Sequence, residues 1–493
     1  MYLGIDLGTS GLKLLLLDDA HRVHASATAA LAVQRPHPTW SEQDPHSWWL
    51  ALQTAVAQLR AEAPQAWAKI RAIGLSGQMH GAVVLDAQGE VLRPAILWND
   101  GRAEQACQTL EQRVPTSRHI TGNLAMPGFT APKLIWLREH EPALFARIRQ
   151  VLLPKDWLRL ELTSEAVSDM SDASGTLWLD VALRQWSPAM LAACDLGVEH
   201  MPRLMEGSAV SGTLRPSLAR EWGLPVTVTV AGGGGDNAAS AVGVGASQPG
   251  EGFVSLGTSG VVFRVGDHYD PAPEQAVHAF AHALPERWHQ MSVMLSAASA
   301  FGWVTQLTGM GNEAQLALAA SALTPAQQNR APLFLPYLSG ERTPHNNPQA
   351  SGAFIGLRSE HGAADLGYAV MEGVAFGLRD GLRAMGQHRD SGGPQAAPLA
   401  LVGGGARSDT WAQLLASTLG QPMHRPHGSH EAAALGAARL AWLADGASTA
   451  LACPPLPLEQ SFEPEAAQGE MLDERYRRFR VLYPALQDAS GAV

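Results

Sequence analysis

The pentapeptide Leu-Gly-Thr-Ser-Gly occurs twice in this chain, at residues 7–11 and 256–260. An apolar run precedes and follows each copy, so both copies predict a strand, a tight glycine turn and a second strand. The two copies start 249 residues apart in a chain of 493 residues. A repeat at half the chain length indicates two homologous lobes, and we predict that they comprise residues 1–246 and 247–493.

The composition fits two compact lobes. Hydrophobic residues make up 46% of the chain and charged residues 16%, which is enough apolar material for sizeable cores and too little charge for a disordered chain. The formal net charge is −11. Such an acidic balance argues against nucleic acid as a partner.

The cysteines and the N-terminus indicate a cytoplasmic protein. Cys107, Cys194 and Cys453 are far apart and form no disulfide framework or zinc motif, which suits a reducing compartment. The N-terminus lacks the basic and apolar regions of a signal peptide. The stretch Ala432–Ala447 comes closest to a membrane span, but Arg439 interrupts it. We therefore expect no membrane partner.

Local patterns predict an α/β fold. Asp44 and Pro45 are typical of a helix start, with Asp44 as the N-cap. Residues 102–201 are expected to be largely helical, and Ser391–Pro398 is expected to form a surface loop. The expected strands include Tyr2–Leu7, Leu12–Leu17, Val23–Leu31, Ile70–Leu75, Val226–Ala231 and Leu399–Val402.

The two repeated turns have the chemistry of phosphate loops. They join strand to strand, so they are not the P-loop, which joins strand to helix and reads G-x-x-x-x-G-K-S/T. Glycines let a ligand approach the backbone, and successive N–H groups in a tight turn bind anions. The turns add hydroxyl donors from Thr9, Ser10 and Thr258 beside Gly257. Two such turns, one from each lobe, could hold a triphosphate from both sides, although each could also be an ordinary hairpin turn.

Two acidic residues are placed for phosphate chemistry. Asp6 precedes the first turn and Lys13 follows it, and a carboxylate beside phosphates suits Mg²⁺. Asp236 follows four glycines and precedes an Ala-rich segment, where it could accept a proton from a substrate or simply cap a helix. Gly233, Gly235 and Ala238 also match the G-x-G-x-x-A pattern of dinucleotide-binding proteins. A carboxylate at that helix start opposes a pyrophosphate, so this match is weak.

Two further segments carry polar or glycine-rich patterns. Gly403–Ser408 follows a strand and precedes an amphipathic helix, and it could bind the adenosine part of a nucleotide. Trp98–Arg102 supplies amide, carboxylate and guanidinium groups that suit a polyol, or else forms a local ion pair. His278 and His282 have a metal-like spacing, but we expect no metal there because no carboxylate lies on a matching face.

Nearly the whole chain resembles the FGGY family of carbohydrate kinases. The segment Gly-Phe-Thr-Ala-Pro-Lys-Leu-Ile-Trp-Leu-Arg-Glu-His at residues 128–140 resembles the first family signature. Residues 352–357, followed by Asp365-Leu366 and Ala369–Glu372, resemble the second. The segments that resemble the family members acting on D-xylulose are residues 40–45, 77–81, 98–102 and 338–344.

The resemblance implies an α/β fold with two ribonuclease-H-like, actin-like ATPase lobes around a central cleft. It also implies that the chain uses ATP and Mg²⁺ to phosphorylate D-xylulose. Asp236 matches the family's catalytic base, Asp6 is the expected Mg²⁺ ligand, and four glycines precede Asp236 where relatives have three. The expected sugar contacts are Asp236, Met79, His80, Asn99, Asp100 and Arg102. The expected nucleotide contacts are Thr9, Ser10, Lys13, Gly257, Thr258, Gly404, Gly405, Ala406 and Asp409.

Other functions stay open at this point. Within the family, the substrate could be another pentulose or a polyol. Outside it, the chain could be a dinucleotide-dependent oxidoreductase or an actin-like ATP switch without a sugar substrate. The oligomeric state is also open, with a homodimer as one candidate.

Overall fold

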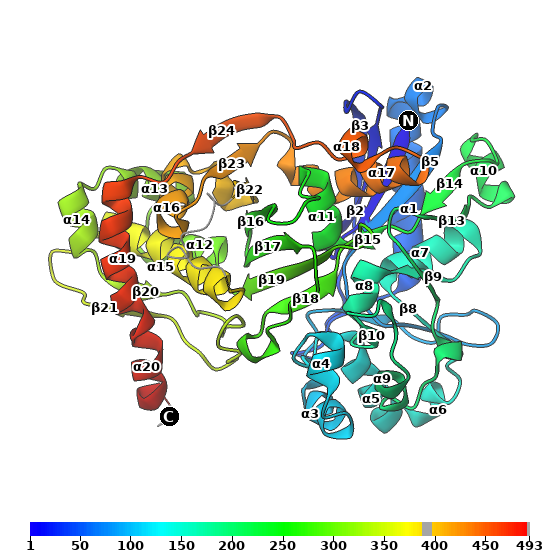
Figure 1. Ribbon diagram of the computed structural model, residues 1–493, viewed down its shortest axis with the longest axis horizontal. Coiled ribbons are helices and arrows are strands. Elements are labelled where there is room, and N and C mark those ends of the chain that lie inside the picture. Colours follow the sequence, from blue (N-terminus) through cyan, green and yellow to red (C-terminus); the bar gives the residue numbers. More distant parts are fainter. Residues whose placement is uncertain (387–396, 491–493) are drawn as a thin grey trace.

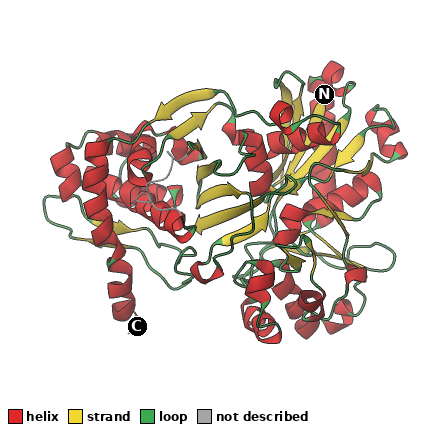
Figure 2. Ribbon diagram, viewed as in Figure 1, coloured by secondary structure: helices red, strands yellow, loops and turns green. Residues whose placement is uncertain are grey.

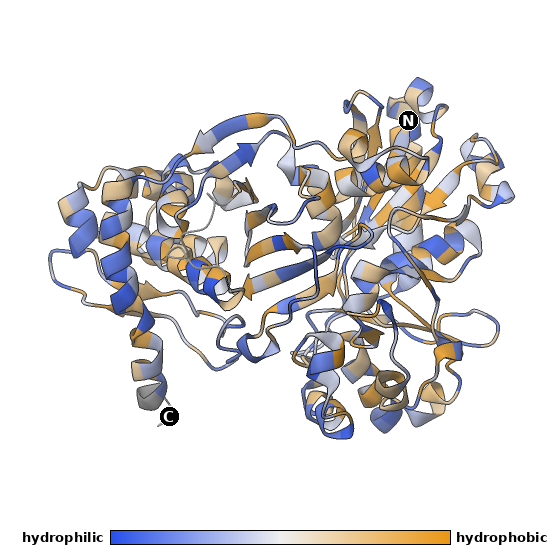
Figure 3. Ribbon diagram, in the orientation of Figure 1, coloured by the Kyte–Doolittle hydropathy of each residue, from blue (hydrophilic) through white to orange (hydrophobic). Residues whose placement is uncertain are grey.

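The computed structural model describes residues 1–386 and 397–490. Two lobes lie side by side, and each contains a mixed sheet with helices packed on it (Figures 1 and 2). Figure 3 shows apolar residues gathered on the strands and polar residues on outer helices such as α14 (Pro325–Arg330) and α19 (Ala466–Arg480). Of the surface loop expected at Ser391–Pro398, residues 391–396 lie outside the described residues.

The first sheet is built around the first copy of the repeat. β1 pairs antiparallel with β2 across the Gly-Thr-Ser-Gly turn and parallel with β5 on its other side. The order of the sheet is β13-β14-β5-β1-β2-β3, and β15 also pairs with β5. Its strands are β1 (Tyr2–Leu7), β2 (Gly11–Leu17), β3 (Val23–Ala30), β5 (Ala72–Gly77), β13 (Val210–Thr213), β14 (Thr229–Ala231) and β15 (Gly234–Gly235).

The second sheet repeats this topology. β16 pairs antiparallel with β17 and parallel with β22, so the order β19-β17-β16-β22-β23 corresponds to β3-β2-β1-β5-β14. The predicted duplication is therefore confirmed in the strand pairing, while a boundary at residue 246 stays a prediction. The strands are β16 (Gly252–Leu256), β17 (Gly260–Gly266), β18 (His278–Ala281), β19 (Trp288–Met294), β22 (Leu399–Val402), β23 (Met423–Pro426) and β24 (Leu458–Phe462).

Helices and short two-stranded sheets complete the first lobe. Asp44 caps α1 as predicted, because its carboxylate accepts a hydrogen bond from the backbone N–H of His46 at 3.0 Å. The helices are α1 (Pro45–Glu62), α2 (Pro64–Trp67), α3 (Glu104–Arg113), α4 (Ser117–Thr121), α5 (Thr130–His140), α6 (Pro142–Phe145), α7 (Pro154–Thr163), α8 (Met170–Ser174), α9 (Pro188–Ala192), α10 (Pro216–Trp222) and α11 (Asp236–Val244). The strand pairs are β4 (Glu42–Gln43) with β7 (Ala95–Ile96), β6 (Val83–Leu85) with β8 (Gln150–Leu152), β9 (Val167–Asp169) with β12 (Arg203–Met205), and β10 (Leu179–Asp180) with β11 (Gln185–Trp186).

The remaining helices follow β17 in the chain. They are α12 (Ala298–Leu307), α13 (Glu313–Ser321), α14, α15 (Ala363–Ala384), α16 (Asp409–Leu419), α17 (Ala432–Ala444), α18 (Thr449–Ala452), α19 and α20 (Leu482–Ser490), with the strand pair β20 (Leu333–Leu335) and β21 (Ala353–Ile355).

Two predictions of local structure need correction. Residues 102–201 are helical only in part, because the short strands β8 to β11 interrupt the helices. The strand expected over Val226–Ala231 begins only at Thr229, and Val226 is exposed rather than buried. In both places an apolar run is too short to distinguish strand, helix and loop without knowledge of its packing partners.

Helix α17 comes late in the chain but packs on the first sheet. It lies against β1, β5 and α11, as the ribbon in Figure 1 shows. A Cβ built on Gly436 would lie 1.8 Å from the carbonyl oxygen of Ala239 in α11, and one built on Gly4 would lie 2.0 Å from the carbonyl oxygen of Ala434. The backbone of α17 therefore contacts the backbone of α11 on one side and that of β1 on the other. Only glycine fits at positions 436 and 4, where these contacts occur.

The stretch that most resembles a membrane span forms this helix. Arg439 of α17 is buried and donates a hydrogen bond to the carbonyl oxygen of Val242 at 3.0 Å. Among the residues that the structure describes, no helix is long and apolar enough to cross a membrane.

Gly436→Ala should destabilise the protein, because its methyl group would overlap the α11 backbone, which cannot move like a flexible side chain. We expect a loss of about 1–3 kcal/mol, seen as a lower Tm in a thermal scan. Gly266→Ala is the matched control, because a Cβ there meets its nearest atom at 3.4 Å, an ordinary contact distance. Equal Tm values for the two variants would contradict the close packing of α17.

Candidate active site

Two predicted acidic residues, Asp6 and Asp236, lie close enough to influence each other. Asp6 is on β1, and Asp236 is the first residue of α11. Burial, and then the charge of Asp6, raise the pKa of Asp236 to about 6. Burial also raises the pKa of Asp6. The fold thus concentrates negative charge at one place, which favours a bound cation or proton.

Asp6 has a free acceptor. Within the described residues, its Oδ1 atom is buried and has no hydrogen-bond partner. Lys13 lies opposite Asp6 in the β1–β2 register, but its Nζ atom forms an ion pair with Glu431 at 3.7 Å. A buried carboxylate oxygen without a protein donor fits a Mg²⁺ ion or one of its water ligands.

The first glycine turn is held by side chains that we did not predict. The hydroxyl group of Thr9 donates to Oε1 of Gln78 at 2.9 Å and accepts from the indole N–H of Trp98 at 2.9 Å. The amide of Gln43 donates to the carbonyl oxygen of Thr9 at 2.8 Å. Ser10 is exposed at the tip. Three separate segments therefore fix this turn. All three lie in stretches that carry the family resemblance, but the sequence did not show that they meet at the turn.

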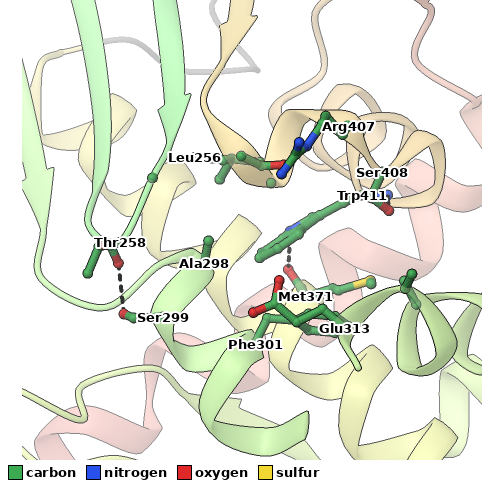
Figure 4. A pocket seen from close by; sticks show the side chains of 15 residues that line it. Leu256, Thr258, Ala298, Ser299, Phe301, Glu313, Met371, Arg407, Ser408 and Trp411 are labelled. Atoms are coloured by element: carbon green, nitrogen blue, oxygen red, sulfur yellow. Dashed lines mark hydrogen bonds between the residues drawn. The ribbon is translucent and has the colours of Figure 1, made fainter. Parts of the chain in front are cut away.

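The second turn lies above the start of α12. The backbone N–H of Ala298 donates to the carbonyl oxygen of Gly257 at 2.8 Å. The hydroxyl group of Ser299 donates to the carbonyl oxygen of Thr258 at 2.7 Å, as drawn in Figure 4. These bonds hold the backbone of the turn on α12 and do not involve the side-chain hydroxyl group of Thr258.

This second turn opens into a cavity of about 750 Å³. The cavity brings the predicted residues Gly257, Thr258, Gly404 and Gly405 together. Its other lining residues are Leu256, Ala298, Ser299, Phe301, Glu313, Ala314, Ala317, Met371, Arg407, Ser408 and Trp411. The volume is within the range of small-molecule sites. A Cβ built on Gly404 would meet no atom closer than 3.9 Å, so a ligand can approach the backbone there.

Five predicted nucleotide contacts lie outside that lining: Thr9, Ser10 and Lys13 of the first hairpin, and Ala406 and Asp409 of the second lobe. Ala406 is buried in the core, and the carboxylate of Asp409 pairs with Arg425 at 2.7 Å. The wall is completed by Trp411, whose indole N–H donates to the carbonyl oxygen of Met371 at 3.1 Å (Figure 4). Met371, Glu313 and Ser299 come from three different helices. Met371 lies in the second family signature, whereas no sequence pattern singled out Glu313 or Ser299.

Met79 and His80 lie next to the segment that carries Asp236. A Cβ built on Gly235 would lie 2.9 Å from Cγ of Met79, so this side chain packs directly against the residue before Asp236. His80 has a left-handed backbone with φ of 69°, and its carbonyl oxygen accepts from Nζ of Lys133 at 2.8 Å. This anchored backbone fixes where the imidazole lies.

The His80 ring is a neutral acceptor. Its Nδ1 atom is 2.6 Å from the carbonyl oxygen of Gly175, and burial lowers the pKa of His80 to about 3. The neutral ring carries its proton on Nδ1, which faces the carbonyl oxygen, so Nε2 is left to accept a hydrogen bond. A sugar hydroxyl group is a suitable donor.

The segment Trp98–Arg102 contains a buried ion pair. A guanidinium nitrogen of Arg102 lies 2.7 Å from Asp100 and 2.7 Å from Glu42, and the guanidinium group stacks on Trp40 at 3.6 Å from the ring centre. Asn99 is exposed. Asp100 and Arg102 thus pair with each other, while Nη1 of Arg102 is buried without a hydrogen-bond partner among the described residues. Direct contact of Asn99, Asp100 and Arg102 with a sugar stays a prediction.

Two further features concern the histidines near this site. The charge of Arg342 lowers the pKa of both His80 and His278, after burial, so its guanidinium group lies within electrostatic reach of both rings. Nδ1 of His278 is 3.1 Å from Oδ1 of Asn123, so this ring nitrogen has a hydrogen-bond partner within the protein. The described residues contain no group of three or more His, Cys, Asp or Glu side chains that could hold a metal ion.

Comparison with known proteins gives similarity over the whole chain. The model of the N-terminal domain of the FGGY family of carbohydrate kinases matches residues 1–243, and that of the C-terminal domain matches residues 252–444. Xylulose kinase of Escherichia coli (strain K12) is 53% identical over 489 residues, which cover 99% of each chain.

Solved structures extend this likeness to the fold. A xyloylose kinase from Brucella ovis has a TM-score of 0.95 at 50% identity, and xylulose kinase from Rhodospirillum rubrum has a TM-score of 0.89 at 28% identity, each match covering 99% of both chains. The predicted α/β fold of two actin-like ATPase lobes is confirmed. The two domain models and the full-length identity leave one assignment: this chain belongs to the FGGY family of carbohydrate kinases.

Proposed function

We propose that this chain is a xylulose kinase, which transfers the γ-phosphoryl group of ATP to the terminal hydroxyl group of D-xylulose. The observation that carries the proposal is the half-buried Asp236, next to Asp6 and to the Met79–His80 segment. The 53% identity to a xylulose kinase over 99% of both chains supports the choice of sugar. The products are D-xylulose 5-phosphate and ADP.

Asp236 acts as the general base in this proposal. Its carboxylate accepts the proton of the sugar's terminal hydroxyl group as the oxygen attacks the γ-phosphorus atom, and the bond between that phosphorus atom and the β–γ bridging oxygen breaks. One oxygen of Asp236 accepts hydrogen bonds from the backbone and side chain of Asn237, at 2.8 and 3.0 Å. These bonds orient the carboxylate and leave its second oxygen for the substrate.

Asp6 would hold Mg²⁺ through its unpartnered oxygen. When bound, Mg²⁺ supplies positive charge that neutralises the phosphate oxygens. Asp6 itself keeps a buried carboxylate oxygen beside Asp236. A cation bound there would reduce the repulsion between the two carboxylates.

The nucleotide would occupy the 750 Å³ cavity, with its phosphates directed along Gly257 and Thr258. The turn that carries Thr9 would approach the same phosphates from the first lobe. Phosphoryl transfer depends mainly on positioning and charge neutralisation, so two turns on two rigid sheets suit the reaction.

The oxidoreductase alternative lacks a binding surface in the glycine run. A Cβ built on Gly233 would lie 2.3 Å from the carbonyl oxygen of Leu75, and one built on Gly232 would lie 2.3 Å from that of Glu206. These glycines pack against other backbone segments rather than facing a space for a pyrophosphate. The glycine run thus serves close packing, which a sequence pattern alone does not distinguish from ligand binding.

A coupled assay of ADP release over ketopentoses, aldoses and polyols tests the function. With ATP and Mg²⁺, D-xylulose should give the highest kcat/KM, at least about tenfold above other pentuloses, because unpaired hydroxyl groups cost binding energy. ADP release without sugar stimulation would favour an ATP switch, and a preference for another sugar would refute the assigned substrate.

Asp236→Asn should lower kcat on the order of 10²–10⁴-fold, because the amide keeps the shape of the side chain but cannot take the proton. Steady-state kinetics with D-xylulose measures the loss. Asp267→Asn is a control, because it makes the same change at an exposed carboxylate that lies against His268. A near-normal kcat in Asp236→Asn would restrict Asp236 to a helix-starting role.

The pH dependence of kcat/KM should have an acid limb near pH 6. The pKa of Asp236 is raised to about 6, so the carboxylate is protonated below this pH and cannot act as a base. Activity is therefore lost as the pH falls through about 6 and is retained above it. If the remaining activity of Asp236→Asn shows the same acid limb as the wild type, the limb belongs to another group.

A further inference from the structure

A fully buried charged cluster lies beneath the proposed catalytic segment. Nζ of Lys155 on α7 is 2.6 Å from Asp156, 2.7 Å from Asp169 and 3.1 Å from Asp172. Arg159, one turn further along α7, pairs with Asp156 at 2.7 Å. All five side chains are 0% exposed.

Acidic and basic side chains contact each other directly in this cluster. Burial alone would lower the pKa of Lys155, but the three carboxylates raise it, so Lys155 is a cation. Burial raises the pKa of Asp172 well above its ordinary value. The side chains of Lys155 and Arg159 thus lie among three buried carboxyl groups. Buried ion pairs are often no more stabilising than apolar packing, so a cluster of this kind calls for a role in fixing geometry.

The cluster makes two direct contacts with the glycine run. The guanidinium group of Arg159 donates to the carbonyl oxygen of Gly232. The hydroxyl group of Ser171 accepts from the backbone N–H of Gly235 at 3.1 Å and donates to Oδ2 of Asp169 at 2.5 Å. Both ends of the four-glycine segment are thus tied to the cluster, and Gly235 is bonded directly to Asp236.

We propose that Ser171 is a positioning residue, which transmits the rigid geometry of the Lys155 cluster through the Gly235 amide to the carboxylate of Asp236. The inference rests on the proposed role of Asp236 as the base. Glycines have no side chains to anchor them, so the segment depends on backbone hydrogen bonds for its position. A displacement of about 1 Å at a reacting group can cost 10²-fold in rate.

Ser168 provides a matched control. Its hydroxyl group is buried and donates to Oδ2 of Asp156 at 2.6 Å, in the same cluster. Among the described residues, its side chain bonds to Asp156 and not to the glycine run. Ser171→Ala and Ser168→Ala therefore each remove one buried hydroxyl group from a cluster carboxylate, but only Ser171→Ala removes the acceptor of Gly235.

The test compares wild type, Ser171→Ala and Ser168→Ala in steady-state kinetics with D-xylulose and Mg-ATP. We expect Ser171→Ala to lower kcat about 10- to 100-fold with KM for ATP unchanged, while Ser168→Ala stays within about twofold of wild type. The acid limb of kcat/KM should move to lower pH in Ser171→Ala alone, because a loosened Asp236 becomes better solvated. A purely structural role would lower Tm in both variants without moving this limb.

Equal kinetics and equal pH profiles in the two variants would overturn the proposal and leave the function untouched. A wild-type protein inactive on D-xylulose would overturn both. If Ser171→Ala does not fold, Ser171→Cys keeps an atom at the γ position with weaker hydrogen bonding, and the same kcat loss and limb shift are required of it.

Discussion

The position of α17 is the packing constraint on which this site depends. The helix comes from the second half of the chain, but it lies between β1, β5 and α11 of the first. Glycines at positions 4 and 436 let its backbone touch both neighbours. Because α11 begins with Asp236 and β1 carries Asp6, the same contact that joins the two halves also fixes the relative position of the two carboxylates.

Repulsion between carboxylates is concentrated at the proposed active site. Asp6 and Asp236 are enclosed near each other, and the described residues give Oδ1 of Asp6 no donor. A few residues away, the carboxylates around Lys155 are paired by cations at 2.6 to 3.1 Å. The carboxylates around Lys155 therefore have cationic partners within the protein. At Asp6 and Asp236 the negative charge is left for the substrate and cation of the proposed function to neutralise.

The two copies of the repeated hairpin have different surroundings. The first turn is tied by Gln43, Gln78 and Trp98, whereas the second lies on the start of α12 and opens into the 750 Å³ cavity. The strand pairing of the two lobes is equivalent, but the helices around each hairpin differ. One lobe thereby supplies the two carboxylates, and the other supplies the cavity that the proposed function assigns to the nucleotide.

The sequence by itself determined the duplicated hairpin, the strand β1, the cap of α1 and the residue types Asp6 and Asp236, because glycine turns, apolar runs and capping residues act over short distances. It left open whether Asp100 and Arg102 face a ligand or each other, and the structure shows them paired. Only the tertiary structure placed α17 on the first sheet, assembled the cavity wall from α12, α13 and α15, and set the Lys155 cluster under the glycine run. These arrangements depend on contacts between residues far apart in the chain, which no local pattern encodes.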